Sequence, residues 1–334
     1  QSIVQQDFFS YIRDISTPSD FRIQYNSWYD NMMRITDDNI MEAFKDIDKN
    51  FVKTGVRPLD SYVIDDGWNV YRKTSSDLQG GIDIERNGKD DVNTAGFWQL
   101  NSKFPNEFYT SSNYVQNMGS YFGVWVGPRG GYNYQGMLAD IIQTGVDTDG
   151  DGVKDVQYGS AAGGSIDVAD SRYIKKFAEM AVDWTNRFKV NYWKWDGFAD
   201  EGQYGAFSKG SIETVGYSES NQHMYGGPNG EYHVTDLWEK WIYIMEEARG
   251  AAAANDITNL WISLTCYTHP SAWFLQWANS VWIQCVMDRG ESANTVLTDK
   301  LNTMLTYRDA VYHNFIVDHE YQFPLSNIYN HDPI

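Results

Sequence analysis

The chain has 334 residues, and its 45 acidic and 26 basic side chains give a formal net charge of −19. Such an acidic surface repels phosphate backbones, which argues against nucleic acid as a partner. No apolar run approaches the ~20 residues that a membrane-spanning helix needs. The chain is long enough for one large domain with its own core, and two cysteines imply no disulfide framework. We therefore expect a single domain over residues 1–334 without a membrane span.

Segments typical of strands and helices alternate along the sequence. Apolar residues at helical spacing predict helices that begin near Thr36 and after Asp170, and further helices around 237–248 and 296–305. Short apolar, β-prone runs predict strands over residues 22–28, 61–66, 121–126, 189–196, 260–266, 280–286 and 322–329.

This alternation is typical of a parallel α/β fold, and long segments after the strands favour a (β/α)₈ TIM barrel over an open sheet. Residues 67–120, 127–169 and 197–234 are interpreted as long loops. Because each follows a strand, we expect them on the catalytic face of the barrel. No candidate for an eighth strand precedes Ile334, so the barrel is expected to be truncated before its last strand.

The most informative stretch is residues 189–200, where a β-prone run ends in Lys194, Trp195 and Asp196 before Gly197. Side chains two apart on a strand share a face, so Lys194 and Asp196 are expected to point the same way, with the neighbouring indole rings on the other side. A cation beside a carboxylate keeps it ionised, as a nucleophile requires. A buried structural ion pair at a strand end explains the same pattern, and this strand alone does not separate the two readings.

Other predicted strands also end in polar or aromatic residues. Trp28 ends the first, Asp65 and Asp66 end the second, and Asp288 follows the sixth. A single aspartate at a strand end can simply cap the next helix. Several of them at one face of a barrel favour a sugar site, because glycosidic cleavage uses two carboxyl groups on either side of the scissile bond.

These motifs resemble the catalytic barrel of the clan D α-galactosidases and α-N-acetylgalactosaminidases, most closely glycoside hydrolase family 36. The specific part is the pair Asp-Asp-Gly-Trp at 65–68 and Trp-Lys-Trp-Asp at 193–196. The similarity runs over about residues 22–290. Supporting matches are residues 26–29, Trp98, residues 103–105, residues 122–125, Cys266, and Trp282 before Asp288.

The resemblance implies roles for individual residues. Asp196 would be the nucleophile that forms a covalent glycosyl-enzyme, and Asp288 the acid/base. The residues around Asp288 differ from those usual in the family, so Asp318 and Glu320 are alternatives for the acid/base. Asp65 and Asp66 would bind the 4- and 6-hydroxyls of the sugar, with Lys194 holding hydroxyls beside the nucleophile. Further substrate-binding positions implied in this way are Trp28, Trp125, Cys266 and Arg289, with Cys266 near the C2 substituent.

The implied activity is that of a retaining exo-α-glycosidase acting on terminal galactose-type sugars of an oligosaccharide or glycoconjugate. A transglycosylase of the raffinose-synthase type and a catalytically silent glycan-binding barrel are the alternatives. Residues 267–273 differ from the family's glycine-rich run near C2, so galactose, N-acetylgalactosamine and galactosamine all remain open. The β-sandwich that precedes such barrels has no counterpart here, so the chain is expected to be a segment of a longer multidomain enzyme.

A second motif has the spacing of a calcium-binding loop, because hard Ca²⁺ prefers oxygen ligands at alternate loop positions. Tyr158 stands where the bidentate glutamate of a full EF-hand would be, and a solvated acidic loop is the alternative. Any Ca²⁺ would be structural, and no cofactor is expected for catalysis. The acidic ligands would be Asp147, Asp149, Asp151 and Asp155, with Val153 at the position that offers a backbone carbonyl.

Acidity and a calcium-type loop favour a secreted or cell-surface bacterial enzyme. Its oligomeric state is not indicated by any pattern in the sequence.

Overall fold

The computed structural model describes residues 2–69, 98–128 except 99 and 102, short pieces between 142 and 166, and residues 170–196, 234–265, 272–282 and 328–329. Its helices are α1 (Ser2–Ile15), α2 (Trp28–Asn31), α3 (Asp37–Asn50), α4 (Tyr109–Asn117), α6 (Ser171–Phe188) and α9 (Val234–Ala254), with 3₁₀ turns at Met32–Arg34, Val52–Thr54 and Ala272–Gln276. Its strands are β1 (Gln24–Asn26), β2 (Ser61–Ile64), β3 (Pro105–Phe108), β4 (Phe122–Val126), β5 (Ala161–Ala162), β6 (Ser165–Ile166), β7 (Val190–Asp196), β8 (Trp261–Thr265), β9 (Ser280–Trp282) and β10 (Ile328–Tyr329).

The main sheet has seven strands in the order β1-β2-β4-β7-β8-β9-β10. All six neighbouring pairs are parallel. Each strand lies beside the next one along the chain, so the order has no reversal point of the kind that defines a doubly wound sheet. The predicted parallel α/β fold is confirmed, and each of the predicted strands contains one of these observed strands.

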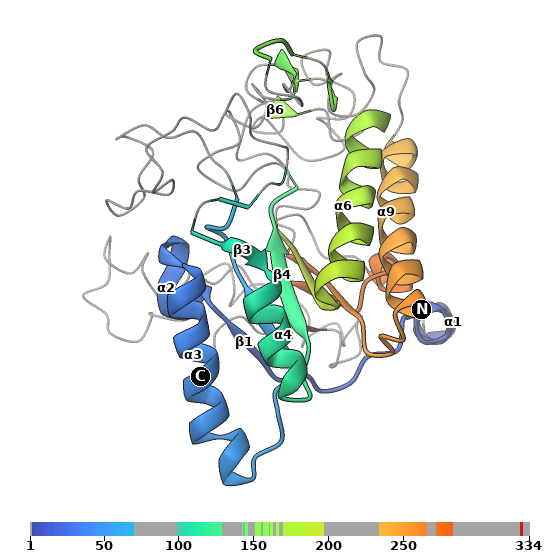
Figure 1. Ribbon diagram of the computed structural model, residues 1–334. Coiled ribbons are helices and arrows are strands. Elements are labelled where there is room, and N and C mark those ends of the chain that lie inside the picture. Colours follow the sequence, from blue (N-terminus) through green and yellow to red (C-terminus); the bar gives the residue numbers. More distant parts are fainter. Residues whose placement is uncertain are drawn as a thin grey trace, which may run out of the picture.

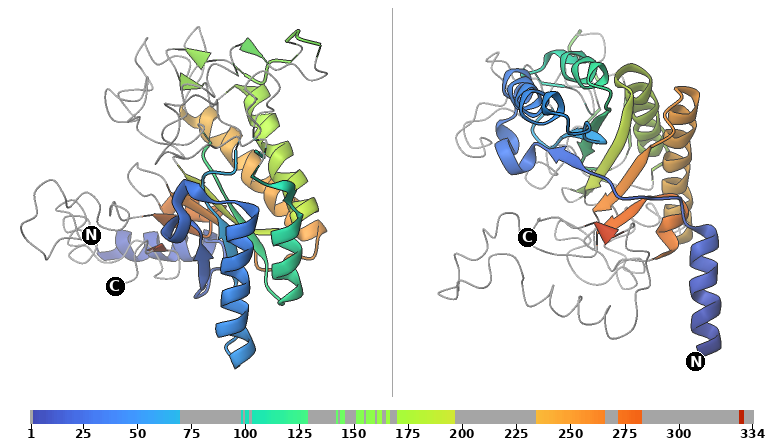
Figure 2. Two further views of the ribbon diagram at one scale, coloured as in Figure 1. Left: turned by 60° about the vertical axis from the view of Figure 1, so that its left-hand side comes forward. Right: turned by 90° about the horizontal axis from the view of Figure 1, so that it is seen from below.

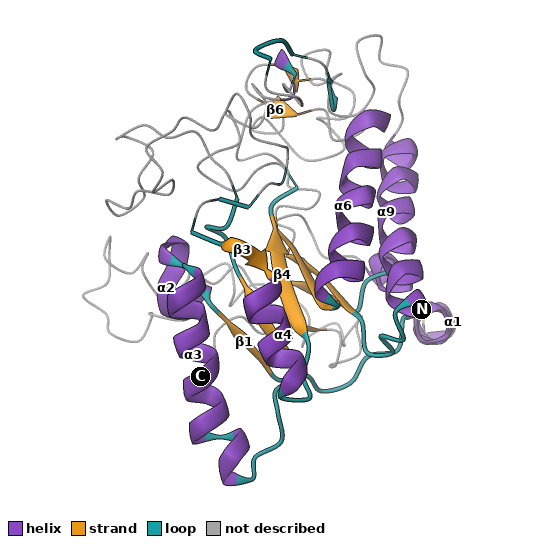
Figure 3. Cartoon of the chain, in the orientation of Figure 1, coloured by secondary structure: helices purple, strands orange, loops and turns teal. Residues whose placement is uncertain are grey.

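The helices that connect these strands lie on one side of the sheet (Figures 1 and 3). Right-handed crossovers that always advance in one direction place every connecting helix on the same face. On α3, the Phe44 ring meets the Tyr62 ring of β2 at 5.0 Å. On α6, the Trp184 ring stacks on Trp193 of β7 at 6.5 Å. Among the helices that the structure describes, none combines the length and apolarity needed to cross a bilayer.

The sheet curls around its other face. Gln24 on β1 donates from Nε2 to the Tyr192 hydroxyl on β7 at 3.2 Å, although β2 and β4 lie between these strands in the sheet. Arg22, just before β1, donates to the carbonyl of Asn259, just before β8, at 2.9 Å. These contacts cross the concave interior, and Figure 2 shows the helices arranged around the outside. In the described part of the chain the sheet ends at β1 and β10, and a closed (β/α)₈ barrel stays a prediction.

Local sequence signals explain where two of the helices start. Thr36 and Asn39 form a capping box at α3, with Asn39 N donating to Thr36 Oγ1 at 3.2 Å and Thr36 N to Asn39 Oδ1 at 2.7 Å. Asp170 caps α6 by accepting from Arg172 N at 2.9 Å. The predicted helix beginnings at Thr36 and Asp170 are confirmed, whereas the helix predicted at 296–305 lies outside the described residues.

Three predictions about connections were wrong. The first strand ends at Asn26 because its carboxamide oxygen accepts the Trp28 backbone N–H at 2.9 Å and turns the chain into α2. The segment 67–120 is not a loop throughout, since β3 and α4 lie within 105–117, and a short antiparallel hairpin of β5 and β6 lies within 127–169. The helix α4 was not predicted because Ser111 and Ser112 occupy buried positions on it, so that its buried side shows no apolar stripe in the sequence.

Candidate active site

The two faces of β7 carry different side chains. Trp193 and Trp195 are fully buried toward the helices, where the Trp195 ring lies 5.3 Å from Phe177. Lys194 and Asp196 alternate with them and therefore face the concave interior. The prediction that the indole rings turn away from these two charged residues is confirmed.

Interior residues of neighbouring strands form rows because the strands are in register. The lower row runs from Gly123 to Tyr192 to Trp261, and the next row from Trp125 to Lys194 to Ser263. Asp65 directly follows β2, whose Ile64 pairs with Val124 just before Trp125. The carboxyl ends of β2, β4 and β7 thus bring Asp65, Trp125 and Lys194 to the same level, with Asp196 one step further.

The lower row closes the bottom of the interior. Val63, Tyr192 and Trp261 pack together, and a Cβ at Gly123 would lie 2.8 Å from Val63 Cγ2. The Arg22 guanidinium lies over the Tyr192 ring at 5.6 Å and the Trp261 ring at 5.3 Å. Burial lowers the pKa of Arg22 to about 10, although the charges of Tyr192 and a neighbouring aspartate oppose the shift. The site above therefore rests on a packed, partly aromatic floor.

The central charged contact joins Lys194 to Asp65. Lys194 Nζ donates to Asp65 Oδ2 at 2.9 Å, and the two side chains are 4% and 2% exposed. The other carboxylate oxygen of Asp65 accepts the Asp66 N–H at 2.8 Å, and the Asp65 N–H donates to Ser27 Oγ at 2.8 Å. This salt bridge crosses from β7 to the end of β2, because the register places Asp65 at the level of Lys194.

Asp196 is held by an indole from the neighbouring strand. Trp125 Nε1 donates to Asp196 Oδ2 at 2.9 Å, and the Trp125 backbone carbonyl accepts from Trp68 Nε1 at 2.9 Å. Trp68 itself is buried against Trp184 of α6, with ring centroids 4.8 Å apart. Asp196 is 8% exposed, so its carboxylate is oriented by a buried donor at the end of β7.

A tight turn carries the Asp65–Asp66 pair into the site. Gly67 has φ +116°, and a Cβ there would lie 2.8 Å from the Met33 carbonyl oxygen, so only glycine fits. The Gly67 N–H donates to Asp66 Oδ1 at 2.7 Å. The buried Lys103 ammonium donates to the same Met33 carbonyl at 3.1 Å, and Asn101 Nδ2 donates to the Gly67 carbonyl at 2.9 Å. The turn is therefore fixed on both sides.

Two residues that support the site were not predicted to have a role in it. Ser27 anchors the backbone at Asp65, and Trp68 fixes the strand that carries Trp125. Ser27 lies in the motif at 26–29 and Trp68 in the motif at 64–68. Their position within these motifs was the only sequence signal that could have indicated a role in the site. Trp28 is partly buried at the start of α2 beside these motifs. Asp288, Arg289 and Cys266 lie outside the described residues, and their predicted roles stay predictions.

The proposed calcium loop is described only in part. Asp151 and Val153 are exposed, and the Val153 N–H donates to Asp151 Oδ1 at 2.7 Å. Gly152 has φ +90°, as the glycine of such a loop requires. The other predicted ligands, Asp147, Asp149 and Asp155, lie outside the described residues. Among the residues that the structure does describe, no cluster of three or more His, Cys, Asp or Glu side chains could hold a metal ion.

The chemistry of the described site follows from its charges. Asp65, Asp66 and Asp196 are buried at one end of the sheet with Lys194 as the neighbouring cation. Carboxylates accept hydrogen bonds from hydroxyl groups, and an excess of negative charge stabilises positive charge that develops on a bound molecule. The arrangement suits a neutral ligand rich in hydroxyls.

No protein-family model and no curated protein matches the chain. The structure does resemble solved structures. The GH36 α-galactosidase AgaB from Geobacillus stearothermophilus matches at 14% identity with a TM-score of 0.50, over 85% of this chain and 34% of that one. TtGalA, an α-galactosidase from Thermus thermophilus, matches at 16% identity with a TM-score of 0.45, over 82% of this chain and 44% of that one.

The α-galactosidase I from Mortierella vinacea matches at 16% identity with a TM-score of 0.40, over 79% of this chain and 45% of that one. The chain thus spans less than half the length of each of these proteins. At such identities a likeness concerns the fold, and the match to AgaB supports a parallel, barrel-type α/β fold for this chain.

Proposed function

We propose that this protein is a glycoside hydrolase that removes terminal α-linked galactose-type sugars with retention of configuration. The observation that carries the proposal is the Asp196 carboxylate, buried at the carboxyl end of β7, oriented by Trp125 and set beside the Lys194–Asp65 pair. The motif resemblance to family 36 supports it, as does the likeness in fold to an α-galactosidase of that family.

In the proposed first step, a carboxylate oxygen of Asp196 attacks the anomeric carbon while the glycosidic bond breaks. The Trp125 indole N–H donates to Oδ2 and holds the carboxylate in position for this attack. This neutral donor stabilises the carboxylate without cancelling its charge. Asp288 would protonate the departing oxygen, and the same residue would then deprotonate the water that releases the sugar from Asp196.

The surrounding charges favour the transition state of this reaction. Positive charge develops on the sugar ring as the bond breaks, and the site holds more carboxylates than cations among its described residues. Asp65 and Asp66 sit on a turn fixed by Gly67, so they can accept hydrogen bonds from sugar hydroxyls without moving. Pre-formed acceptors lower the cost of ordering the site when substrate binds.

We further propose a structural Ca²⁺ in the loop of residues 147–155. The left-handed Gly152 and the hydrogen bond from the Val153 N–H to Asp151 Oδ1 fit such a loop, and the carboxylates there are oxygen ligands of the type Ca²⁺ prefers. We also propose an extracellular or cell-surface location, as the acidic composition favours.

The proposal is tested with nitrophenyl α-galactoside, α-N-acetylgalactosaminide and α-galactosaminide. Wild type should release nitrophenol from at least one of them, and Asp196→Ala should lower that rate by at least 1000-fold, on the order expected for a removed nucleophile. Asp46→Ala, which removes an exposed carboxylate from α3, is the matched control and should keep full activity.

Azide distinguishes a nucleophile from a residue that only binds. Azide can enter the space left in Asp196→Ala and attack the anomeric carbon directly, which gives a β-glycosyl azide from an α-substrate. Formation of that product assigns Asp196 as the nucleophile. If wild type cleaves none of the three sugars, or Asp196→Ala keeps wild-type activity, the proposal fails. Sugar transfer to an added galactoside in preference to water would instead identify a transglycosylase.

A further inference from the structure

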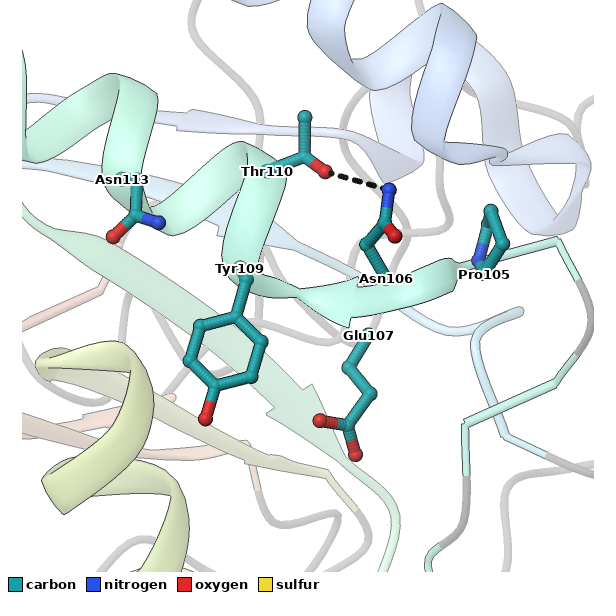
Figure 4. A pocket seen from close by; sticks show the side chains of 6 residues that line it. All are labelled: Pro105, Asn106, Glu107, Tyr109, Thr110 and Asn113. Carbon is teal, nitrogen blue, oxygen red and sulfur yellow. Dashed lines mark hydrogen bonds between the residues drawn. The ribbon is translucent and has the colours of Figure 1, made fainter.

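A pocket lies outside the main sheet, where β3 runs into α4. It has a volume of about 480 Å³, within the range of small-molecule sites. Figure 4 shows Tyr109 and Glu107 pointing to the same side of this segment, toward α6. The residues that line it are Pro105, Asn106, Glu107, Tyr109, Thr110 and Asn113.

This pocket is separate from the candidate active site. The buried Phe108 ring, at the end of β3, lies 5.1 Å from Phe122 and 5.6 Å from Phe188. Phe122 occupies a helix-facing position on β4, whereas Trp125 on the same strand faces the interior and contacts Asp196. The sheet and a layer of aromatic rings therefore separate the two sites.

The Tyr109 ring is both held in place and open to solvent. The Arg187 guanidinium of α6 lies over it at 5.3 Å, and Arg187 Nε donates to its hydroxyl at 3.1 Å. The Phe188 ring meets it edge-on at 5.0 Å. Tyr109 nevertheless stays 41% exposed. A fixed and exposed aromatic ring is a surface on which an amphipathic molecule can stack without ordering the side chain first.

Glu107 adopts a conformation that needs support. Its φ of +52° lies in the left-handed region, which costs a non-glycine residue about 1–2 kcal/mol. The salt bridge from Arg187 holds its carboxylate there. Arg187 thus fixes both Glu107 and Tyr109, and it also pairs with Asp183 at 3.1 Å, so one guanidinium is shared by two carboxylates. Strain of this kind gathers at binding sites, where the surrounding contacts maintain it.

The remaining polar groups of the pocket are uncharged. Asn106 Nδ2 lies 3.5 Å from Thr110 Oγ1, a weak hydrogen bond that a ligand hydroxyl can replace. The exposed Asn113 carboxamide forms no hydrogen bond with any other described residue. Carboxamides offer a donor and an acceptor together, as a sugar diol does. With two carboxylates around one guanidinium, and on a chain of net charge −19, the pocket does not favour an anion.

We propose that this pocket is a second, non-catalytic carbohydrate-binding site that takes a sugar unit of a neutral oligosaccharide. The apolar face of the sugar stacks on Tyr109, and its hydroxyls bond to Asn106, Glu107 and Asn113. The site does not depend on the chemistry at Asp196. It offers a substrate chain a second point of attachment, which raises its effective concentration near the enzyme.

Calorimetric titration with stachyose, raffinose, maltotriose and cellotriose tests the proposal. Tyr109→Ala should remove one binding site for at least one of these probes, or raise its Kd at least tenfold, whether or not the active site binds the same sugar. Tyr109→Phe keeps the ring and should change Kd less than threefold. Tyr243→Ala on α9 removes a tyrosine that is 45% exposed away from this pocket, and should change nothing.

Labelling with 3-fluorotyrosine reports the site directly. The ¹⁹F resonance that disappears in Tyr109→Phe belongs to Tyr109, and it should shift when a bound probe is added. Equal stoichiometry and affinity in wild type and Tyr109→Ala, or a Tyr109 resonance that none of the four sugars moves, would overturn the proposal. If wild type cleaves no nitrophenyl glycoside but binds one of these sugars through Tyr109, the proposed hydrolase activity fails and the proposed binding site holds.

Discussion

Replacing Lys194 by methionine should destabilise the fold strongly. Lys194 Nζ lies 2.9 Å from Asp65 Oδ2, and both side chains are almost fully buried. Removing the cation leaves the Asp65 carboxylate buried without its ion-pair partner, while the Asp66 N–H still donates to its Oδ1. Breaking a buried pair from one side typically costs about 3–5 kcal/mol. We expect a loss of this size in the free energy of unfolding.

Urea denaturation followed by tryptophan fluorescence measures this loss. The matched control is Lys175→Met on α6, whose ammonium lies 3.8 Å from Glu179 with both side chains more than half exposed. An exposed pair of this kind contributes less than about 0.5 kcal/mol. The double variant Lys194→Met/Asp65→Asn should lose less than the sum of its single variants, because it leaves no unpaired charge.

A loss below about 1 kcal/mol in Lys194→Met would contradict this prediction, since it would mean that Asp65 does not depend on the Lys194 ammonium for its burial. Strict additivity in the double variant would refute the direct contact between the two side chains.

Three further predictions follow from the site and its supports. Trp125→Phe removes the donor to Asp196 and should lower kcat about 10- to 100-fold, because a hydrogen bond to a charged group contributes about 1.5–3 kcal/mol. An unchanged kcat would show that the indole does not orient the nucleophile. Gly67→Ala puts a Cβ against the Met33 carbonyl and should destabilise by about 1–3 kcal/mol in urea denaturation, while Gly119→Ala, with open space around it, should cost less. At a free concentration of 100 times its Kd, Ca²⁺ should stabilise the folded protein by about 2.7 kcal/mol and raise its Tm, and Asp151→Ala should weaken this effect. A Tm that neither Ca²⁺ nor EDTA changes would contradict a calcium site.

The fold was predictable from short apolar strands and two well-capped helices. Strand alternation also placed Lys194 and Asp196 on one face and their tryptophan neighbours on the other, as the structure has them. This succeeded because the period of two is a property of any strand and needs no knowledge of its neighbours.

The partners across the site were not predictable in the same way. Lys194 and Asp65 are 129 residues apart, and their contact depends on the register between β2, β4 and β7. The Trp125–Asp196 bond depends on the same register, which a single sequence does not encode as a local pattern. The helix α4 was not predicted for another reason. Its buried face is made partly of serines, so its apolar residues do not recur at helical spacing.

The claim that Asp196 is the nucleophile is tested most directly by trapping the covalent intermediate. A fluorinated galactosyl fluoride, whose ring fluorine slows hydrolysis of the glycosyl-enzyme more than its formation, is incubated with the full-length protein, which is then digested and analysed by mass spectrometry. We expect one added sugar, on the peptide that contains Asp196 and on its carboxylate, and none in Asp196→Ala. A sugar attached to a different residue, or an active enzyme that accumulates no adduct and inverts configuration, would contradict it.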